Sequence, residues 1–312
     1  MDSSKIEVAH DFFPYIRIYK DGRVEKCVIP DFVPPSLDSH SGVSSKDVVI
    51  TPKGVSARIF LPNIKITDHP HRKLPVLVYF HAFSTIYHRY VSSLVAEADV
   101  VAVSVEYRLA PEHPLPTAYD DCFTAFKWVA SHSKGDGPEA WLNDHGDLDR
   151  VFLAGDSAGA NLAHSVAVRI GGEFGVDGVK KISGLALIHP YFEGKEPLGP
   201  EASDEEKMAK VGKLWLYLCP STIGCNDPRI NPAADPRVSS LACNRVGVWV
   251  SEKDYLREPG GLFYYETLRK SGWGGVAELI EEEGEDHDFH LFTPDSEKAV
   301  AMLKGVASFL NQ

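Results

Sequence analysis

The sequence predicts a single α/β domain built on a mainly parallel sheet with helices on both faces. From about residue 47, short runs rich in β-branched residues alternate with longer amphipathic stretches, and most of the short runs are apolar almost throughout. Strands of this kind are typical of parallel sheets that are covered on both faces. One strand–turn–helix segment with flanking glycines also indicates where chemistry would take place.

Eight strands are expected, at residues 47–51, 55–61, 74–80, 100–107, 150–155, 182–189, 246–251 and 276–282. The clearest helical patterns between and after them cover residues 118–132, 157–170, 260–272 and 297–312. Two segments break the alternation, and loops of such length in a compact domain are usually functional. We therefore expect one domain over 1–312, with an N-terminal lid segment at 1–46 and a cap insertion at 193–222, both over the carboxyl edge of the sheet.

Composition excludes several classes of function. The net charge of −12 and the pI near 5.5 argue against a nucleic-acid partner, since phosphate contacts require clustered Lys and Arg. No stretch approaches the roughly 20 apolar residues of a membrane span, and the N-terminus lacks a signal-peptide layout, which predicts a cytoplasmic protein. The five cysteines are scattered and form no C-x-x-C pair, so we expect reduced thiols, no zinc site and no cofactor.

The most specific local signal is Gly155-Asp156-Ser157-Ala158-Gly159, which follows an apolar strand and precedes a helix. In a G-x-S-x-G turn the glycines allow a sharp, strained elbow that places the serine hydroxyl at the helix N-terminus. The alternative is that Ser157 is an ordinary N-cap between loop glycines. The strand and helix on either side favour a nucleophile.

A serine nucleophile needs a base, and the base needs an acid that orients it. In this fold class the chain order is serine, acid, histidine. Asp254 directly follows an expected strand, and His287 and His290 lie in the loop after the next strand. His290 stands between two apolar residues and is expected to pack, so His287 is the predicted base. The nearby acidic run at 281–286 would raise the basicity of His287 if it lies close.

Several motifs in a common order resemble the plant carboxylesterase family, the hormone-sensitive-lipase-like α/β-hydrolases. They are "YRLAPEHPLPTAYDD", "GDSAGAN", "EKDYLRE" and "EDHDFHLF", with "PYIRIYKDGRVE" near the N-terminus. The resemblance covers nearly the whole chain. It implies an α/β-hydrolase fold with an N-terminal lid, hydrolysis of small esters, and a triad of Ser157, Asp254 and His287. By the family's pattern, Arg108 and Glu112 hold the loop under the active site by ion pairing, and the alternative is that they contact substrate.

Relatives of that family include isoflavone-forming dehydratases and gibberellin receptors, so the fold does not determine the function. The receptors replace the catalytic histidine and the dehydratases carry threonine at the nucleophile, whereas this chain has His287 and Ser157. Hydrolysis of small hydrophobic esters through an acyl-Ser157 intermediate is the leading hypothesis. A small-molecule-binding relative and a dehydratase or cyclase that uses His287 as base are the alternatives.

The chain departs from the family after His81. The family motif there is H-G-G-G-F or H-G-G-A-F, but here His81 passes directly into "AFSTIYHRY", a gap of about eight positions by eye. Ala158 N–H remains as an oxyanion donor, whereas the donors of the glycine loop are missing, which predicts weak turnover. Rescue could come from the hydroxyls of Ser84 or Thr85 or from the N–H groups of Ala82 or Phe83. An imperfect gene model or splice form would also explain the gap. A metal pair formed by His81 and His88 is not expected, because no further ligand lies at suitable spacing.

Overall fold

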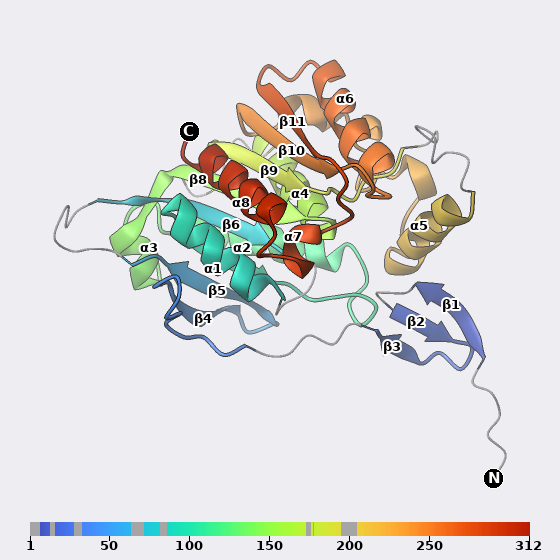
Figure 1. Cartoon of the computed structure of the whole chain (residues 1–312), viewed down its shortest axis with the longest axis horizontal. Helices are drawn as coiled ribbons and strands as arrows, with labels where there is room; N and C mark the ends of the chain where they lie inside the picture. Colours follow the sequence, from blue (N-terminus) through green and yellow to red (C-terminus); the bar gives the residue numbers. More distant parts are fainter. Residues whose placement is uncertain are drawn as a thin grey trace, which may run out of the picture.

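The computed structural model describes residues 7–12, 16–27, 33–63, 72–81, 86–172, 176, 178–194 and 205–312. Its centre is an eight-stranded sheet in the order β11-β10-β9-β8-β6-β7-β5-β4 (Figure 1). The pairs β4–β5 and β5–β7 are antiparallel, and the other five pairs are parallel. The predicted α/β fold with a mostly parallel eight-stranded sheet is confirmed.

The main-sheet strands lie close to the predicted runs: β4 (Ser44–Thr51), β5 (Val55–Leu61), β6 (Leu74–Phe80), β7 (Val101–Glu106), β8 (Gly146–Asp156), β9 (Gly184–Ile188), β10 (Arg245–Ser251) and β11 (Val276–Glu282). The helices are α1 (Ile86–Ala98), α2 (Thr117–Ala130), α3 (Ala140–His145), α4 (Ala158–Gly172), α5 (Glu205–Leu218), α6 (Phe263–Lys270), α7 (Phe289–Phe292) and α8 (Glu297–Leu310). The predicted helix at 260–272 is shorter, because a π-helical turn at Arg257–Leu262 precedes α6.

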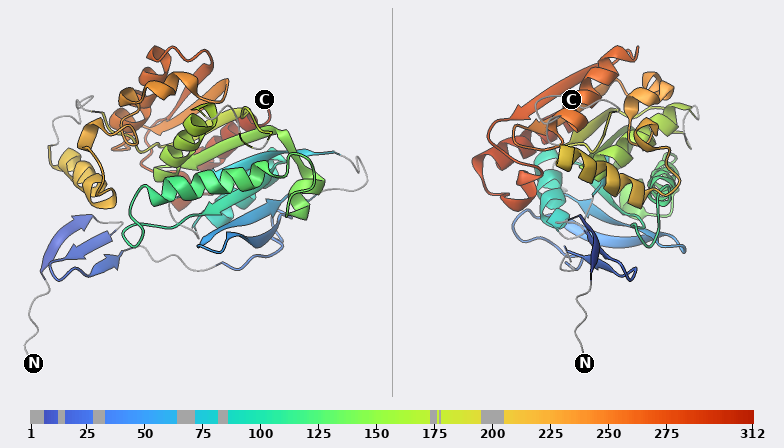
Figure 2. Two further views of the ribbon diagram at one scale, coloured as in Figure 1. Left: turned by 180° about the vertical axis from the view of Figure 1, so that it is seen from behind. Right: turned by 90° about the vertical axis from the view of Figure 1, so that its right-hand side faces the viewer.

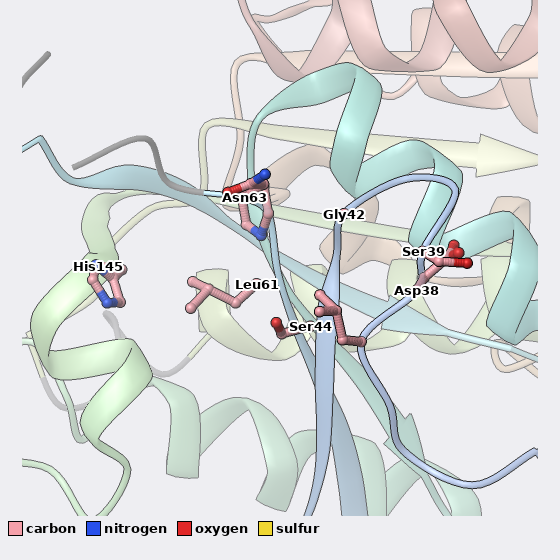
Figure 3. A pocket seen from close by; sticks show the side chains of 9 residues that line it. Asp38, Ser39, Gly42, Ser44, Leu61, Asn63 and His145 are labelled. Atoms are coloured by element: carbon pink, nitrogen blue, oxygen red, sulfur yellow. The ribbon is translucent and has the colours of Figure 1, made fainter. Parts of the chain in front are cut away.

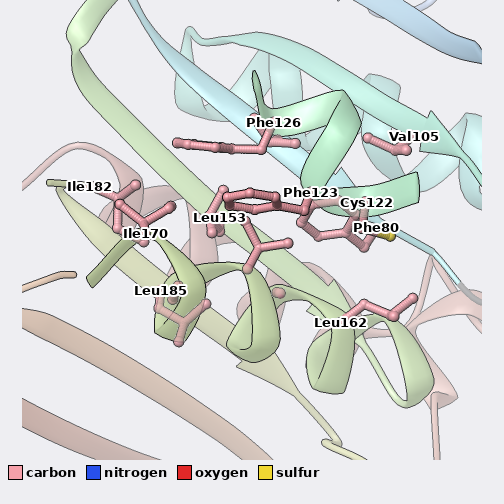
Figure 4. Close-up of a cluster of buried hydrophobic side chains, with 14 of the residues drawn as sticks. Phe80, Val105, Cys122, Phe123, Phe126, Leu153, Leu162, Ile170, Ile182 and Leu185 are labelled. Carbon is pink, nitrogen blue, oxygen red and sulfur yellow. The ribbon is translucent and has the colours of Figure 1, made fainter. Parts of the chain in front are cut away.

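Helices cover both faces of the sheet (Figure 2). Strand β6 shows why its sequence is apolar without alternation, since all seven of its residues are buried. Val76, Val78 and Phe80 pack in the cluster formed with α2 and α4 (Figure 4), whereas Leu77 and Tyr79 pack on the opposite face against α1 and α8. Side chains therefore cover both faces of the sheet along the whole of β6.

A small antiparallel sheet lies outside this core. It consists of β1 (Val8–Phe12), β2 (Ile16–Tyr19) and β3 (Val24–Lys26) and lies beside α5 in both Figure 1 and Figure 2. A cluster of Phe12, Ile16 and Ile18 packs against Leu214 and Tyr217 of α5. These strands were not predicted from the sequence, because the segment is polar overall and the apolar face formed by its described residues is small.

Among the described residues, no helix combines the length and apolar character that crossing a membrane requires.

Candidate active site

The turn between β8 and α4 holds Ser157 in a left-handed conformation. Its φ is 50°, a region that a non-glycine residue occupies only when its surroundings impose it. The Ser157 N–H donates to the carbonyl oxygen of Ile188 at 2.9 Å, and the Ser157 carbonyl accepts from the N–H of Tyr191 at 3.1 Å. Both partners belong to the end of β9 and the residues after it, so the neighbouring strand holds the elbow in place.

Two glycines allow the elbow to press against the end of β6. A Cβ at Gly159 would lie 1.9 Å from the carbonyl oxygen of Phe80, and one at Gly155 would lie 2.4 Å from the carbonyl oxygen of Gly159. Both obstacles are backbone atoms and cannot rotate away. The glycines of the G-x-S-x-G motif are therefore required by the close approach of α4 to β6.

Gly159→Ala is expected to destabilise the protein by about 3 kcal/mol or more, because the new methyl group would force α4 and β6 apart. Gly172→Ala is the matched control, since it lies in the same helix with no atom within 4 Å of the added Cβ. The control should be neutral or slightly stabilising. Urea denaturation of both variants measures the difference, and equal stabilities would contradict this account of the elbow.

The structure brings the three predicted triad residues together at the carboxyl edge of the sheet. Nε2 of His287 lies 3.0 Å from Oγ of Ser157, and Nδ1 of His287 lies 3.0 Å from Oδ2 of Asp254. Ser157 follows β8, Asp254 follows β10 and His287 follows β11. Because the ends of neighbouring parallel strands meet at one edge, residues distant in sequence converge here.

Oδ2 of Asp254 and Nδ1 of His287 are close together, but the contact does not meet the geometry of a regular hydrogen bond. Asp254 is 1% exposed, and its Oδ1 accepts the N–H of Leu256 at 2.8 Å. That second bond fixes the carboxylate in its position beside the imidazole. Catalytic hydrogen bonds in ligand-free sites are often misaligned in this way and tighten with substrate.

Sequence reasoning missed two further residues at this edge, Asp288 and His189. Oδ2 of Asp288 lies 3.2 Å from Nε2 of His287, and its Oδ1 lies 3.1 Å from Nδ1 of His189. Nε2 of His189 is in turn 2.9 Å from Oγ of Ser251. One available signal was that His189 directly follows β9 and so must lie at the same edge as the triad.

Asp156 ties helix α1 to the elbow. This buried carboxylate accepts a hydrogen bond from the Tyr79 hydroxyl at 2.8 Å and a second one from the hydroxyl of Tyr87. Tyr87 stands in the first turn of α1, directly after the chain segment that follows His81. The start of α1 is thus anchored beside Ser157 even though the preceding loop is short.

Buried charges shift the pKa values of these groups in opposite directions. Burial lowers the pKa of His287, but the Asp288 and Asp254 carboxylates outweigh burial and raise it well above the usual range. Burial raises the pKa of Asp288, yet His287 and His189 bring it below the usual range. Burial and the nearby Asp288 raise the pKa of Asp156 well above its usual value, although the hydrogen bonds from Tyr87 and Tyr79 oppose this shift.

His81 directly follows the last residue of β6 and is buried beside the elbow. It is 4% exposed, its carbonyl oxygen accepts from the Tyr107 hydroxyl at 2.5 Å, and its Nε2 lies 3.2 Å from Oε1 of Glu106. Its backbone N would be 3.3 Å from a Cβ at Gly159, so the chain leaves β6 beside the first turn of α4. The proposed rescue donors at 82–85 lie outside the described residues.

The other side chains considered in the sequence each contact a neighbouring residue. Arg108 forms two hydrogen bonds to the Asp121 carboxylate at 2.9 and 2.6 Å. Further contacts are the Glu112–Lys26 ion pair, Nδ1 of His88 beside Arg58, and the buried His290 edge-on to Tyr90. Arg108 and Glu112 are thus both ion-paired, although not to each other.

Two groups of side chains could in principle ligate a metal. Among the described residues, His189, Asp254 and His287 place ligand atoms within 4.8 Å of one another, and so do His189, Asp288 and His290. The nitrogens of His287 already face Ser157 and Asp254, and those of His189 face Asp288 and Ser251. These contacts fit proton transfer better than metal binding.

Two described cavities lie away from the Ser157 hydroxyl. One of about 450 Å³, shown in Figure 3, opens at the opposite edge of the sheet between the start of β4, the end of β5 and His145. The other, of about 350 Å³, lies under the first turn of α1 beside Arg58, His88 and Glu106. Neither is lined by a triad residue, so neither is taken as the substrate site.

The fold and the elbow define an α/β-hydrolase, and comparison with known proteins agrees. The family model described as "alpha/beta hydrolase fold" matches residues 78–291. An esterase structure from Pyrobaculum calidifontis has a TM-score of 0.66 and 26% identity, covering 86% of this chain and 84% of that one. The chain therefore has the α/β-hydrolase fold.

Curated plant proteins narrow the assignment further. "Probable carboxylesterase 2" of Arabidopsis thaliana is 44% identical, covering 100% of this chain and 99% of that protein. "Tuliposide A-converting enzyme 2, chloroplastic" of Tulipa gesneriana is 45% identical, covering 97% of this chain and 79% of that protein. The chain belongs to the plant carboxylesterase family, which places it among the carboxylic ester hydrolases.

Proposed function

We propose that the protein is a serine carboxylesterase that hydrolyses small hydrophobic carboxylic esters through an acyl-Ser157 intermediate. The observation that carries this proposal is the continuous contact from Oγ of Ser157 to Nε2 of His287 at 3.0 Å and from Nδ1 to Oδ2 of Asp254, also at 3.0 Å. This is the arrangement by which a neighbouring base makes a serine hydroxyl nucleophilic.

Each group has a defined role in the two half-reactions. His287 Nε2 takes the Ser157 proton as Oγ bonds to the ester carbonyl carbon, while Asp254 holds the imidazole and balances its charge. When the C–O bond to the alcohol breaks, Nε2 returns the proton to the leaving oxygen. A water molecule then repeats the sequence on the acyl-enzyme, which releases the carboxylic acid and restores Ser157.

The oxyanion that forms in each half-reaction has one donor in the described part of the site. Ala158 begins α4 and is exposed, and an N–H in the first turn of a helix has no intrahelical acceptor. The family's glycine loop would supply the others, but it is shortened after His81. Loss of one oxyanion donor costs about 10²–10³ in rate, so we propose an esterase with slow turnover.

The shortened loop favours a second candidate, a weakly active or non-catalytic relative that binds a small molecule. A dehydratase or cyclase of specialised metabolism would use the same pocket with His287 as base. The triad contacts favour hydrolysis over both. The acidic net charge of −12 also favours a small ester over a polyanionic partner, and a cytoplasmic location remains our proposal.

We further propose that the chain is one domain whose lid comes from the segments 1–46, of which residues 44–46 already belong to β4, and 193–222. Packing of Phe12, Ile16 and Ile18 against α5 supports this, because it joins the N-terminal segment to the insertion. Specificity for the acyl and alcohol groups would then reside in these two segments together.

The proposal is tested by reaction with a fluorophosphonate probe and by turnover of a p-nitrophenyl acyl ester. Labelling with turnover, both absent in Ser157→Ala, is the expected result. Labelling without turnover would indicate an activated serine without an effective oxyanion hole and would favour the binding candidate. Failure of the folded protein to react with the probe would overturn the assignment of an activated Ser157.

A further inference from the structure

The nitrogen of His287 that faces Ser157 has a second oxygen neighbour. Nε2 lies 3.0 Å from the Ser157 Oγ and 3.2 Å from Oδ2 of Asp288. A general base must offer a lone pair at Nε2, and an ionised carboxylate opposes that lone pair but attracts an N–H. Asp288 therefore favours the imidazolium over the neutral ring.

Asp288 is held in this position by both its backbone and its side chain. It has φ 54° and is 7% exposed. Its N–H donates to Nδ1 of His189 at 3.0 Å, and its Oδ1 is 3.1 Å from the same nitrogen. A bare Nδ1 accepts the amide hydrogen of Asp288, whereas an N–H at Nδ1 donates to Oδ1, so in each tautomer of His189 one of the two contacts is a hydrogen bond to Asp288.

Other titratable groups around His287 and Asp288 come from five elements. They are Asp254 and Tyr255 after β10, His189 after β9, Asp156 at the end of β8, Tyr90 on α1 and His290 on α7. Burial lowers the pKa of His290 to about 3 and raises the pKa of Tyr90 above its usual value, and both shifts favour the uncharged side chain. Burial and the nearby Asp288 raise the pKa of Asp156, although hydrogen bonds from Tyr87 and Tyr79 oppose this. Of the carboxylates in the described part of the chain, those of Asp254 and Asp288 contact the nitrogens of the His287 ring.

We propose that Asp288 is a positioning residue that holds a proton on Nε2 of His287 and so moves the onset of activity toward alkaline pH. The inference rests on the proposed function, in which His287 is the base for Ser157. In the resting enzyme Asp288 competes with Ser157 for Nε2. After proton transfer it stabilises the imidazolium beside the oxyanion, and the proton must leave this contact to reach the alcohol oxygen.

The direction of the effect follows from the base's protonation state. Activity requires neutral His287 and falls as the pH drops below its pKa, so a raised pKa places the acid limb at higher pH. Removing a charge in direct contact changes a pKa by roughly one to three units. Asp288→Asn should therefore move the acid limb of the pH profile to lower pH by that amount. At a fixed pH on the limb, the fraction of neutral His287 should rise roughly tenfold for each unit by which its pKa falls.

The experiment measures the rate constant for fluorophosphonate labelling of Ser157, and kcat/KM for a p-nitrophenyl ester, as functions of pH. Asp288→Asn and Asp288→Gly are compared because asparagine and glycine both tolerate the left-handed backbone. Glu283→Gln is the matched control, since it removes one negative charge from an exposed position in the same loop. We expect a midpoint above the ordinary histidine value in the wild type, lower midpoints in both Asp288 variants and no change in the control.

A wild-type midpoint at or below the ordinary histidine pKa of about 6.5 would overturn the inference, as would Asp288 profiles that coincide with wild type. If neither Asp288 variant folds, NMR titration of His287 in the wild-type protein tests whether the imidazole keeps its proton above the ordinary histidine range, because that measurement requires no activity. Absence of labelling at every pH would overturn the proposed function, and the same titration would then still decide whether His287 retains its proton to alkaline pH.

Discussion

Replacing Asp254 by asparagine is expected to slow ester hydrolysis by about 10⁴-fold, the cost of presenting the base in the wrong tautomer. The carboxylate Oδ2, 3.0 Å from Nδ1 of His287, keeps a hydrogen on Nδ1 and leaves Nε2 free for the Ser157 proton. An amide could instead donate to Nδ1 and place the ring hydrogen on Nε2. Asp288, 3.2 Å from Nε2, would then stabilise that unproductive form.

The measurement is kcat for a p-nitrophenyl ester, supplemented by the rate of fluorophosphonate labelling where turnover is slow. Asparagine retains an oxygen that can accept the Leu256 N–H, so the variant should melt close to the wild type, and its thermal transition is the control for folding. A folded variant that keeps more than about a tenth of the wild-type rate would contradict the assignment of Asp254 as the orienting acid.

Inserting Gly-Gly-Gly-Phe after His81 is expected to raise kcat by about 10²–10³-fold, the contribution of a restored oxyanion donor. The structure gives the geometric reason, because the end of β6 abuts the first turn of α4. A Cβ at Gly159 would be 1.9 Å from the Phe80 carbonyl and 3.3 Å from the His81 nitrogen. A glycine loop that leaves β6 at this point begins beside Ala158, the other proposed donor.

The matched control is an insertion of equal length, Gly-Pro-Pro-Phe, in which two backbone N–H groups are removed. Turnover of the same ester is compared in both proteins, and Ser157→Ala is introduced into each to show that the gain requires the nucleophile. An unchanged rate, or an equal gain from the proline insertion, would show that missing loop donors do not limit turnover.

Much of the site could be predicted from the sequence because each predicted residue follows a parallel strand. Ser157, Asp254 and His287 come after β8, β10 and β11, whose ends meet at one edge. Asp288 was not predicted, although it is adjacent to His287. Its side chain reaches Nε2 through a left-handed backbone at φ 54° and contact with His189, and neither feature has a sequence pattern of its own.

The N-terminal region shows a similar limit. Its strands β1 to β3 have one small apolar face that packs on α5, a helix about 200 residues further along the chain. Local periodicity in a polar segment was too weak to indicate strands, because their stability depends on that distant contact.

The sequence by itself determined the α/β fold and the family, and it predicted the chain order of nucleophile, acid and base, because these depend on hydrophobic periodicity and on short motifs with local steric requirements. Only the tertiary structure decided how α4 presses on β6, how Asp156 anchors α1, and that two carboxylates contact the His287 ring. The physical reason is that these features depend on how the strand ends, the first turns of α1 and α4 and the loop after β11 are placed relative to one another in the fold. Their distances and charges exist only once the sheet has formed.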